Sequence, residues 1–238
     1  MRPGLTERSE VSPKAEFDPE SANDLGRTRD LRGLILVTAA VSQELQDFKF
    51  GRDSGIECLV TGMGPRAESV VRRRLKRGDV GLVVSTGFAG AIRPGFHVGD
   101  LVLASEVIHA PSGDRSRPVS SFFSLSDRAS VGPFVTVEKA LVDPKAKAWA
   151  GNRFGGIAVD MESAAVAEAA DEAGVGWVAV RAILDPMEIP LAIRSRAQAL
   201  TCLASPGRWK EFFGFLRTVR TASRSLASGL HELIKTKG

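Results

Sequence analysis

The chain has 238 residues, 43% hydrophobic and 25% charged, and its 32 basic and 28 acidic side chains leave a net charge of +4. This composition is typical of a soluble globular protein with one large domain, which excludes general disorder, a coiled coil, collagen and a membrane bundle. No apolar run approaches the ~18 residues that span a bilayer. The two cysteines, Cys58 and Cys202, and the three histidines form no metal-binding or disulfide pattern. We therefore expect no metal site and a reducing, cytoplasmic location.

The first 30 residues differ in composition from the rest of the chain. They mix charges, prolines and serines, and Phe17 is their only aromatic residue. Because so little apolar area cannot offset the entropy lost on ordering, residues 1–30 are predicted to be a disordered tail. They also lack the apolar stretch of a secretory signal. The domain and its chemistry are expected in residues 31–238.

Short apolar runs predict buried strands, each ending in glycine, small or acidic residues. In chain order they lie at 34–38, 56–61, 81–86, 100–105, 134–137, 157–159 and 177–183, and Gly87 is expected to end the third. Helices are predicted at 67–75 and 162–173, the second ending at Gly174. The stretch 110–133 lacks periodicity and is expected to be a long surface loop. This alternation predicts an α/β fold, a single domain with a central mixed or mostly parallel sheet flanked by helices.

Three acidic residues follow predicted strands at the edge where α/β sheets bind ligands. They are Glu44, Glu162 and Asp185, and two glycine turns, Gly62–Gly64 and Thr86–Gly90, accompany them. Glycines let a backbone approach a ligand closely, and carboxylates without metal ligands favour acid–base chemistry or the recognition of hydroxyl groups. The alternative interpretation of each acid is a helix cap or a solvated side chain.

Three ordered segments resemble a known family. Residues 83–102 (VVSTGFAGAIRPGFHVGDLV), 159–165 (VDMESAA) and 180–185 (VRAILD) are similar to signature segments of the nucleoside phosphorylase/nucleosidase superfamily. Within it, the chain resembles the methylthioadenosine/S-adenosylhomocysteine nucleosidases and the hopanoid-associated adenosylhopane nucleosidases. The second group is favoured by AVDMES at 158–163 and by the basic C-terminal extension. The resemblance implies a nucleoside phosphorylase-like fold and an enzyme that cleaves an adenine-type nucleoside with water and without a cofactor.

The resemblance also implies roles for individual residues. Glu162 matches the glutamate that accepts hydrogen bonds from the ribose 2′- and 3′-hydroxyls, and Met161 would lie under the sugar. Asp185 matches the aspartate that donates a proton to purine N7, although the serine that usually precedes it is replaced here by Leu184. Glu44 fits the glutamate that activates water, with a cap or surface role as its alternative.

The remaining expectations concern the walls of the site. Thr86, Gly87, Phe88 and Ala89, with Gly90, would lie beside base and sugar; Ser85 and Thr86 are within reach of the water or of a phosphate. Arg181 stands inside an apolar strand, where an unpaired charge is expensive, so it is expected to pair with Glu162 or Glu44.

Two other functions remain open at this stage. A phosphorylase would use phosphate as co-substrate and needs arginines, for which Arg66, Arg115 and Arg117 are the candidates; hydrolysis is preferred because no arginine precedes Gly87. A non-catalytic nucleoside-binding protein would need only Glu162 and Asp185. Nucleic acid is not expected as a partner, because no aromatic residues interleave with the basic cluster 72–77. A homo-oligomer is implied by the resemblance.

Residues 205–238 predict a basic amphipathic C-terminal helix. Its apolar side chains recur at three- and four-residue steps, at Trp209, Phe212, Phe213, Leu216, Val219, Leu226, Leu230 and Leu233. A helix packed on the sheet with solvated arginines explains this stripe and is preferred. The alternative is an interfacial helix that brings the site to a lipid-linked adenosine at an anionic membrane.

Overall fold

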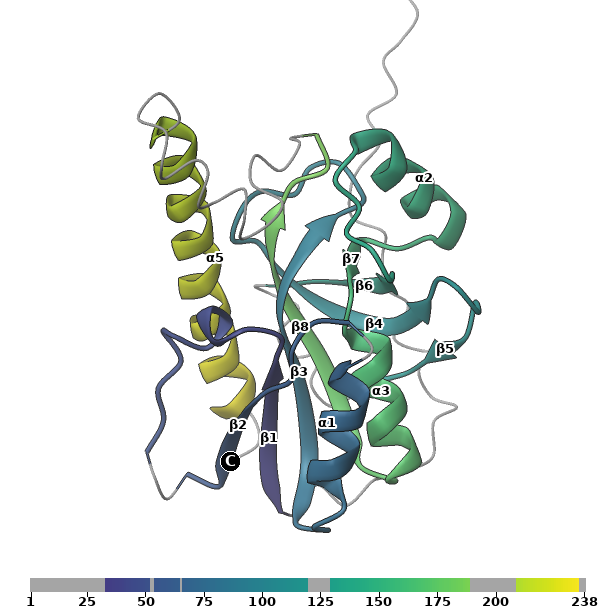
Figure 1. Cartoon of the computed structure of the whole chain (residues 1–238), viewed down its shortest axis with the longest axis vertical. Helices are drawn as coiled ribbons and strands as arrows, with labels where there is room; N and C mark the ends of the chain where they lie inside the picture. Colours follow the sequence, from purple (N-terminus) through teal and green to yellow (C-terminus); the bar gives the residue numbers. More distant parts are fainter. Residues whose placement is uncertain (1–32, 52–53, 65, 120–128, 189–208, 236–238) are drawn as a thin grey trace, which may run out of the picture.

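The computed structural model describes residues 33–51, 54–64, 66–119, 129–188 and 209–235 (Figure 1). The tail predicted for residues 1–30 lies outside them. The described chain is an α/β fold whose central sheet combines parallel and antiparallel pairs, as predicted. Its strands are β1 (Leu34–Ala39), β2 (Ile56–Val60), β3 (Val80–Ala91), β4 (Leu101–His109), β5 (Arg115–Ser116), β6 (Ala129–Thr136), β7 (Ala158–Asp160) and β8 (Gly176–Asp185).

Five of these strands close into a ring. One set runs parallel, in the order β2-β1-β3-β8, and a second set, β7-β6-β4, is also parallel within itself. The sets meet through antiparallel pairs at both sides, β3 with β7 and β4 with β8. Closure removes the open edges from β3, β8, β4, β6 and β7. The sheet therefore curls around an interior in which polar side chains need partners from several strands.

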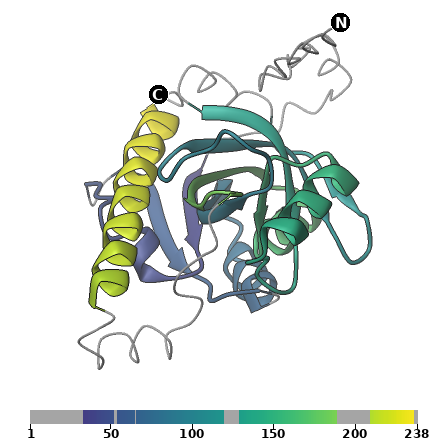
Figure 2. The ribbon, with the colours of Figure 1, turned by 90° about the horizontal axis from the view of Figure 1, so that it is seen from above.

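Helices cover the two faces of the sheet. α1 (Arg66–Leu75) and α3 (Ser163–Glu172) pack on one face, where Trp177 and Phe134 are fully buried. The long helix α5 (Trp209–Lys235) crosses the opposite face (Figure 2). No described helix is long and apolar enough to cross a membrane.

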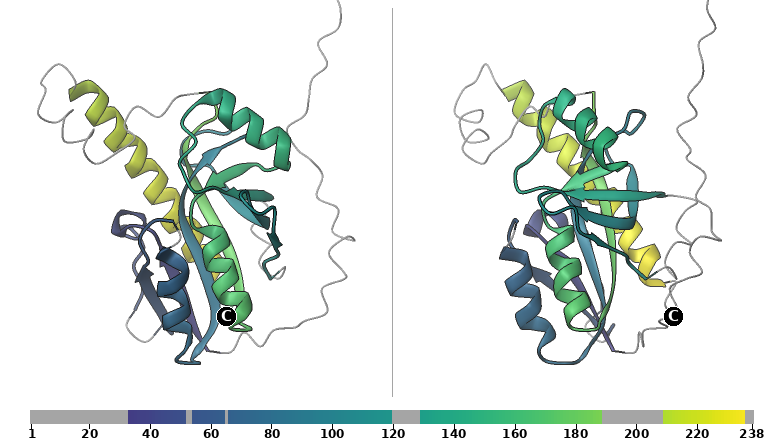
Figure 3. Two further views of the ribbon diagram at one scale, coloured as in Figure 1. Left: turned by 45° about the vertical axis from the view of Figure 1, so that its right-hand side comes forward. Right: turned by 90° about the vertical axis from the view of Figure 1, so that its right-hand side faces the viewer.

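The described side chains of α5 that are buried against the sheet belong to its C-terminal half. Ala222, Leu226, Leu230 and Leu233 are buried against strand residues, in agreement with the predicted stripe. The other half leans away from the sheet (Figure 3). There the stripe departs from the prediction, because Phe213 and Leu216 are exposed.

Two predicted boundaries are wrong. β3 does not end at Gly87 but continues to Ala91, because its distal half pairs with β8 and β7. The expected surface loop 110–133 contains β5 and the beginning of β6. Both strands pair with β4, and this pairing stabilises them although the local sequence shows no strand periodicity. Residues 120–128 of that loop lie outside the described part.

Helix α2 (Pro144–Phe154) is an element that the sequence reading missed. Asp143 caps its start by accepting a hydrogen bond from the Lys145 amide, Pro144 occupies its first turn, and Gly155 in the left-handed conformation ends it. Gly151 packs on the end of β3 so closely that an added Cβ would lie 2.1 Å from the Ile92 carbonyl oxygen.

The packing of Gly151 gives a test with a matched control. Gly151→Ala forces backbone apart and should lower the free energy of unfolding by about 1–3 kcal/mol. Gly214→Ala places the same methyl group on α5 in open space and should raise it by about 0.5–1 kcal/mol. Urea unfolding of both variants measures the difference. Equal effects would show that α2 does not pack through Gly151.

Candidate active site

Two of the predicted acids contact neighbouring points of one strand. Glu44, at the end of the 3-10 turn η2 (Ser42–Glu44), contacts β3 at Gly87 and Phe88. Asp185, the last residue of β8, pairs with Gly90 of β3. A Cβ on Gly90 would lie 3.6 Å from Asp185 Oδ2. The distal part of β3 therefore runs between the two carboxylates.

Glu44 is buried and held by backbone amides. Its Oε1 accepts a hydrogen bond from Phe88 N at 2.9 Å and its Oε2 from Val41 N at 3.1 Å. An added Cβ on Gly87, whose φ is +147°, would lie 2.6 Å from Oε1, so this approach requires glycine. Burial raises the pKa of Glu44 above its usual value, against the lowering effect of the amides and of Arg181. Such a carboxylate is suited to accept a proton.

Glu162 lies just before α3 and reaches the first glycine turn. Its Oε1 accepts a hydrogen bond from Gly64 N at 3.0 Å. Burial is the main cause that raises the pKa of Glu162 to about 7, and the nearby charges of Asp160 and Glu44 raise it further, whereas the Gly64 amide and Arg181 lower it. Glu44 and Glu162 thus lie close enough to affect each other electrostatically.

Arg181 pairs with neither of the glutamates that the sequence suggested. Its Nη2 forms an ion pair with Asp160 Oδ2 at 2.8 Å and also donates to the hydroxyls of Ser85 and Ser163. Its Nη1 donates to the carbonyl oxygens of Ser85, at 2.7 Å, and Val180. The prediction that Arg181 pairs with a carboxylate was right, but the predicted partners, Glu162 and Glu44, were wrong. The observed partner is Asp160, the last residue of β7, which the ring places beside β3. Arg181 acts on Glu44 and Glu162 only through its charge.

Asp185 has a partner that the sequence did not reveal. Lys147 on α2 is fully buried, and its Nζ lies 2.5 Å from Asp185 Oδ2. The same Nζ is 3.0 Å from the carbonyl oxygen of Pro186 and 3.3 Å from that of Asp185. In the sequence, the helix that carries Lys147 is indicated only by Asp143-Pro144 at its start and Gly155 at its end. The burial of Lys147 is not indicated, because most lysines on a helix are exposed.

The predicted wall residues are mostly inside the fold. Thr86 and Ala89 are buried, whereas Phe88 and Met161 are partly exposed. Ser85 Oγ is engaged by Arg181 at 2.9 Å. The Thr86 hydroxyl is buried without a hydrogen-bond partner among the described residues, so a water or ligand hydroxyl there would satisfy it.

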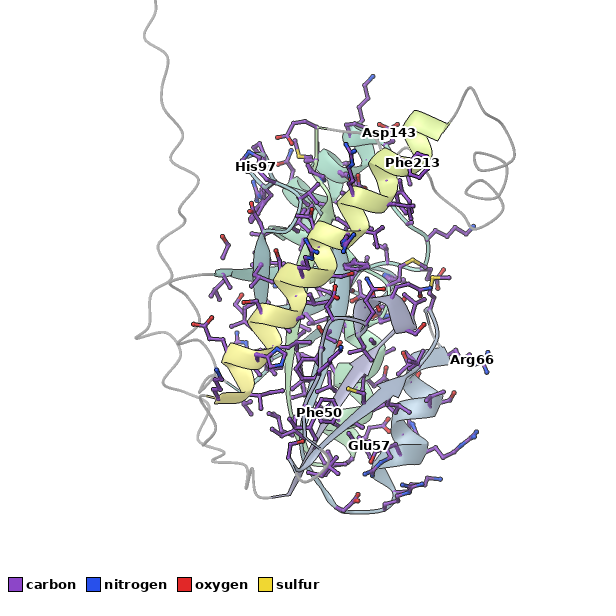
Figure 4. All side chains as sticks on the ribbon, turned by 90° about the vertical axis from the view of Figure 1, so that its left-hand side faces the viewer. Phe50, Glu57, Arg66, His97, Asp143 and Phe213 are labelled. Atoms are coloured by element: carbon purple, nitrogen blue, oxygen red, sulfur yellow. The ribbon has the colours of Figure 1, made fainter. Side chains whose placement is uncertain are left out.

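The arginines considered for phosphate lie in different surroundings. Arg115 on β5 is paired with Glu106, at the edge of the sheet. Arg66 begins α1 directly after the first glycine turn and is exposed (Figure 4). Arg117 is also exposed. None of these three has a hydrogen bond to Glu44, Glu162 or Asp185 in the described part of the chain.

An open cavity of about 540 Å³ lies beside the carboxylates rather than around them. Of the predicted site residues it includes Met161, and much of its remaining lining is acidic, from α1 and α3: Glu68, Glu168, Asp171 and Glu172. We place the site at Glu44, Glu162 and Asp185. Glu44 and Asp185 contact β3, and Glu162 lies close enough to Glu44 for that charge to raise its pKa. Carboxylates with directed hydrogen bonds carry chemistry, whereas a solvated acidic surface does not.

Comparison with known proteins agrees with this architecture. Residues 46–200 match the family described as the Phosphorylase superfamily. A 5′-methylthioadenosine/S-adenosylhomocysteine nucleosidase from Geobacillus thermodenitrificans is 27% identical over an alignment of 169 residues; the match covers 58% of this chain and 71% of that protein.

Solved structures share the fold. The nucleosidase of the same name from S. pneumoniae, bound to the transition-state inhibitor MT-ImmA, superposes with a TM-score of 0.65 at 19% identity, covering 86% of this chain and 99% of that one. A futalosine hydrolase mutant from Helicobacter pylori gives a TM-score of 0.64 at 16% identity, covering 85% and 99%. The expected fold and the resemblance to these nucleosidases are confirmed, and since the family match covers more than half of its length, the chain belongs to the phosphorylase superfamily.

Proposed function

We propose that this protein is a nucleosidase that hydrolyses the N-glycosidic bond of a purine nucleoside, with an adenine-type base preferred. The observation that carries the proposal is the pair of neighbouring carboxylates, the buried Glu44 and the partly buried Glu162, each held by backbone amides. The Geobacillus relative, named for hydrolysis of two adenine nucleosides, supports the same reaction class.

Glu162 is assigned to the sugar. A carboxylate accepts hydrogen bonds from two vicinal hydroxyls, here the ribose 2′ and 3′ groups, and its negative charge stabilises the oxocarbenium-like sugar of the transition state. Met161, partly exposed next to it, supplies an apolar floor for the ring.

Glu44 and Asp185 are assigned to the two proton transfers. Glu44 takes a proton from water as the water oxygen bonds to C1′. The C1′–N9 bond breaks, its electron pair stays on the base, and Asp185 gives its proton to N7. Glu44 then loses its proton to solvent and Asp185 takes one from solvent, which restores both residues for the next reaction. Thr86, with its unpartnered hydroxyl, and Gly87, Phe88 and Ala89 form the wall between these two acids.

Two other functions use the same residues. Phosphorolysis would place phosphate where water attacks, with Arg66, which follows the first glycine turn, as a candidate to bind the anion. Hydrolysis is preferred because Arg181, the cation whose charge acts on Glu44 and Glu162, is already occupied by Asp160 and the serine hydroxyls. A non-catalytic nucleoside-binding protein would not need a water-activating base, and the buried Glu44 favours the enzyme over it.

We further propose that the substrate carries a 5′ substituent and that α5 brings the protein to a lipid-linked adenosine, as in the hopanoid-associated group. Phe213 and Leu216 are 52% and 44% exposed, and Arg217, Arg220 and Arg224 on the same helix are exposed as well. Figure 4 shows Phe213 on the half of α5 that does not pack on the sheet. Apolar and basic groups together suit an anionic membrane surface. A homo-oligomer remains part of the proposal.

Replacing the proposed base tests hydrolysis directly. Glu44→Gln should lower kcat/KM for adenine release from methylthioadenosine by about 100-fold or more, because the amide accepts no proton from water. Glu68→Gln, on the solvated part of α1, is the control and should act like the unmodified protein. Base release from adenosine, methylthioadenosine and inosine is measured with and without phosphate. Release that needs phosphate would reject hydrolysis. A Glu44→Gln variant that stays active would show that Glu44 is not the residue that takes the proton from water.

The raised pKa of Glu162 gives the activity a pH dependence. Sugar recognition needs the ionised carboxylate, so kcat/KM should fall as pH drops below about 7. The folded state keeps a proton that the unfolded chain, with a pKa near 4.5, releases, so the contribution of Glu162 to stability falls as pH rises from 4.5 to 7. The Tm of Glu162→Gln minus the Tm of the unmodified protein should therefore increase as pH rises from 5 to 8. A difference in Tm that is constant with pH would contradict the shift.

Lipid binding is tested by substitution, since truncation at residue 205 would remove the buried Leu226, Leu230 and Leu233. The full chain should co-sediment with phosphatidylglycerol vesicles, less so at high salt, and Phe213→Ser with Leu216→Ser should abolish this. Val60→Ser on the edge strand β2 removes a comparably exposed side chain and serves as control. A full chain that ignores the vesicles shows that α5 has no membrane role.

A further inference from the structure

Lys147 is a buried cation whose hydrogen-bonding capacity is matched by its surroundings. Its ammonium has three donors, and three acceptors surround it: Asp185 Oδ2 at 2.5 Å, Pro186 O at 3.0 Å and Asp185 O at 3.3 Å. Its exposed fraction is 0%. Lysine is almost never buried to this degree without a specific partner. All three acceptors belong to Asp185, the last residue of β8, or to Pro186, which follows it.

The backbone that carries Lys147 is fixed at several points. The Asp143 side chain caps the start of α2, and Gly151, one turn beyond Lys147, packs on the carbonyl of Ile92. Arg93 Nη2 donates to the carbonyl oxygen of Gly151 at 3.2 Å. These contacts hold α2 against the end of β3, so the Lys147 ammonium is presented to Asp185 by a rigid element.

A purely structural role does not account for this arrangement. Burying an ion pair costs desolvation of both charges, and a well-packed apolar pair would stabilise the fold as well or better. The side chain before Asp185 gives the carboxylate no hydrogen bond, because Leu184 is apolar; it is partly buried against the cluster that includes α5. Lys147 is the cation that the described structure pairs with the proposed proton donor.

We propose that Lys147 is a positioning residue for the leaving-group acid, holding the Asp185 carboxyl in place and stabilising the carboxylate formed when its proton moves to the base. This inference rests on the proposed function and deepens it. As the C1′–N9 bond breaks, its electron pair goes to the base and the Asp185 proton goes to N7. The negative charge left on Asp185 then faces an ammonium across 2.5 Å.

The experiment compares two leaving groups. Adenine in methylthioadenosine needs a proton to depart, whereas the nitrophenolate of 4-nitrophenyl β-D-ribofuranoside departs as an anion without one. Lys147→Met should lower kcat for adenine release about 100-fold with KM changed less than about threefold, and should leave nitrophenolate release within about threefold. Asp185→Asn should show the same split between substrates. Lys145→Met, exposed on the same helix, should leave both rates unchanged.

A second variant separates charge from packing. Lys147→Gln keeps a donor for the backbone carbonyls but has no charge, so the proposal requires it to behave like Lys147→Met. If both variants lose the two activities together, or fail to fold, Lys147 only supports the structure and the proposal is wrong. If both variants cleave methylthioadenosine at the unmodified rate, the inference fails while the proposed function stands. Unmodified protein that releases no base from any purine nucleoside overturns the proposed function, and the inference with it.

Discussion

The buried guanidinium of Arg181 is the constraint on which the arrangement of the site depends. A charge in the interior of a sheet is tolerated only when its donors are satisfied, and here the partners come from β3, β7, β8 and α3. These four elements are therefore locked in one relative position. The same positive charge reaches Glu44 and Glu162 without bonding to them, and it offsets part of the cost of bringing two carboxylates together out of water.

Backbone amides hold the carboxylates of Glu44 and Glu162 in place. The amides of Phe88, Val41 and Gly64 direct the oxygens of Glu44 and Glu162, and Gly87 lets the strand come within contact of Glu44. α5 supports the same region from outside, because Ser223 donates to the carbonyl oxygen of Gln43 at 3.2 Å. The acids are thus fixed by the main chain, whose positions follow from the fold, and substitution of nearby side chains will disturb them little.

The sequence predicted most of the sheet and the acids that gather beside it, because buried strands and post-strand carboxylates are local patterns. It did not predict pairings made across the ring. Asp160 accepts a hydrogen bond from the nearby Ser163 amide, which is a local contact, but its ion pair with Arg181 exists only because β7 closes onto β3. The sequence analysis did not predict α2, and the contacts of Gly151 with Ile92 and of Lys147 with Asp185 join residues that are far apart in the chain.

The closed ring of strands has a consequence for how the chain reaches its native state. β3 pairs with β7 and β8, so Gly90 meets Val159 and Val83 meets Trp177, residues far apart in the chain. The loop entropy of such contacts is lost before their stabilisation is gained, which slows folding of non-local sheets. During synthesis the ring cannot close until β8 has emerged, and until then the edges of β3 and β4 are open to strands of other chains. Refolding at high concentration is therefore expected to compete with aggregation through these edges.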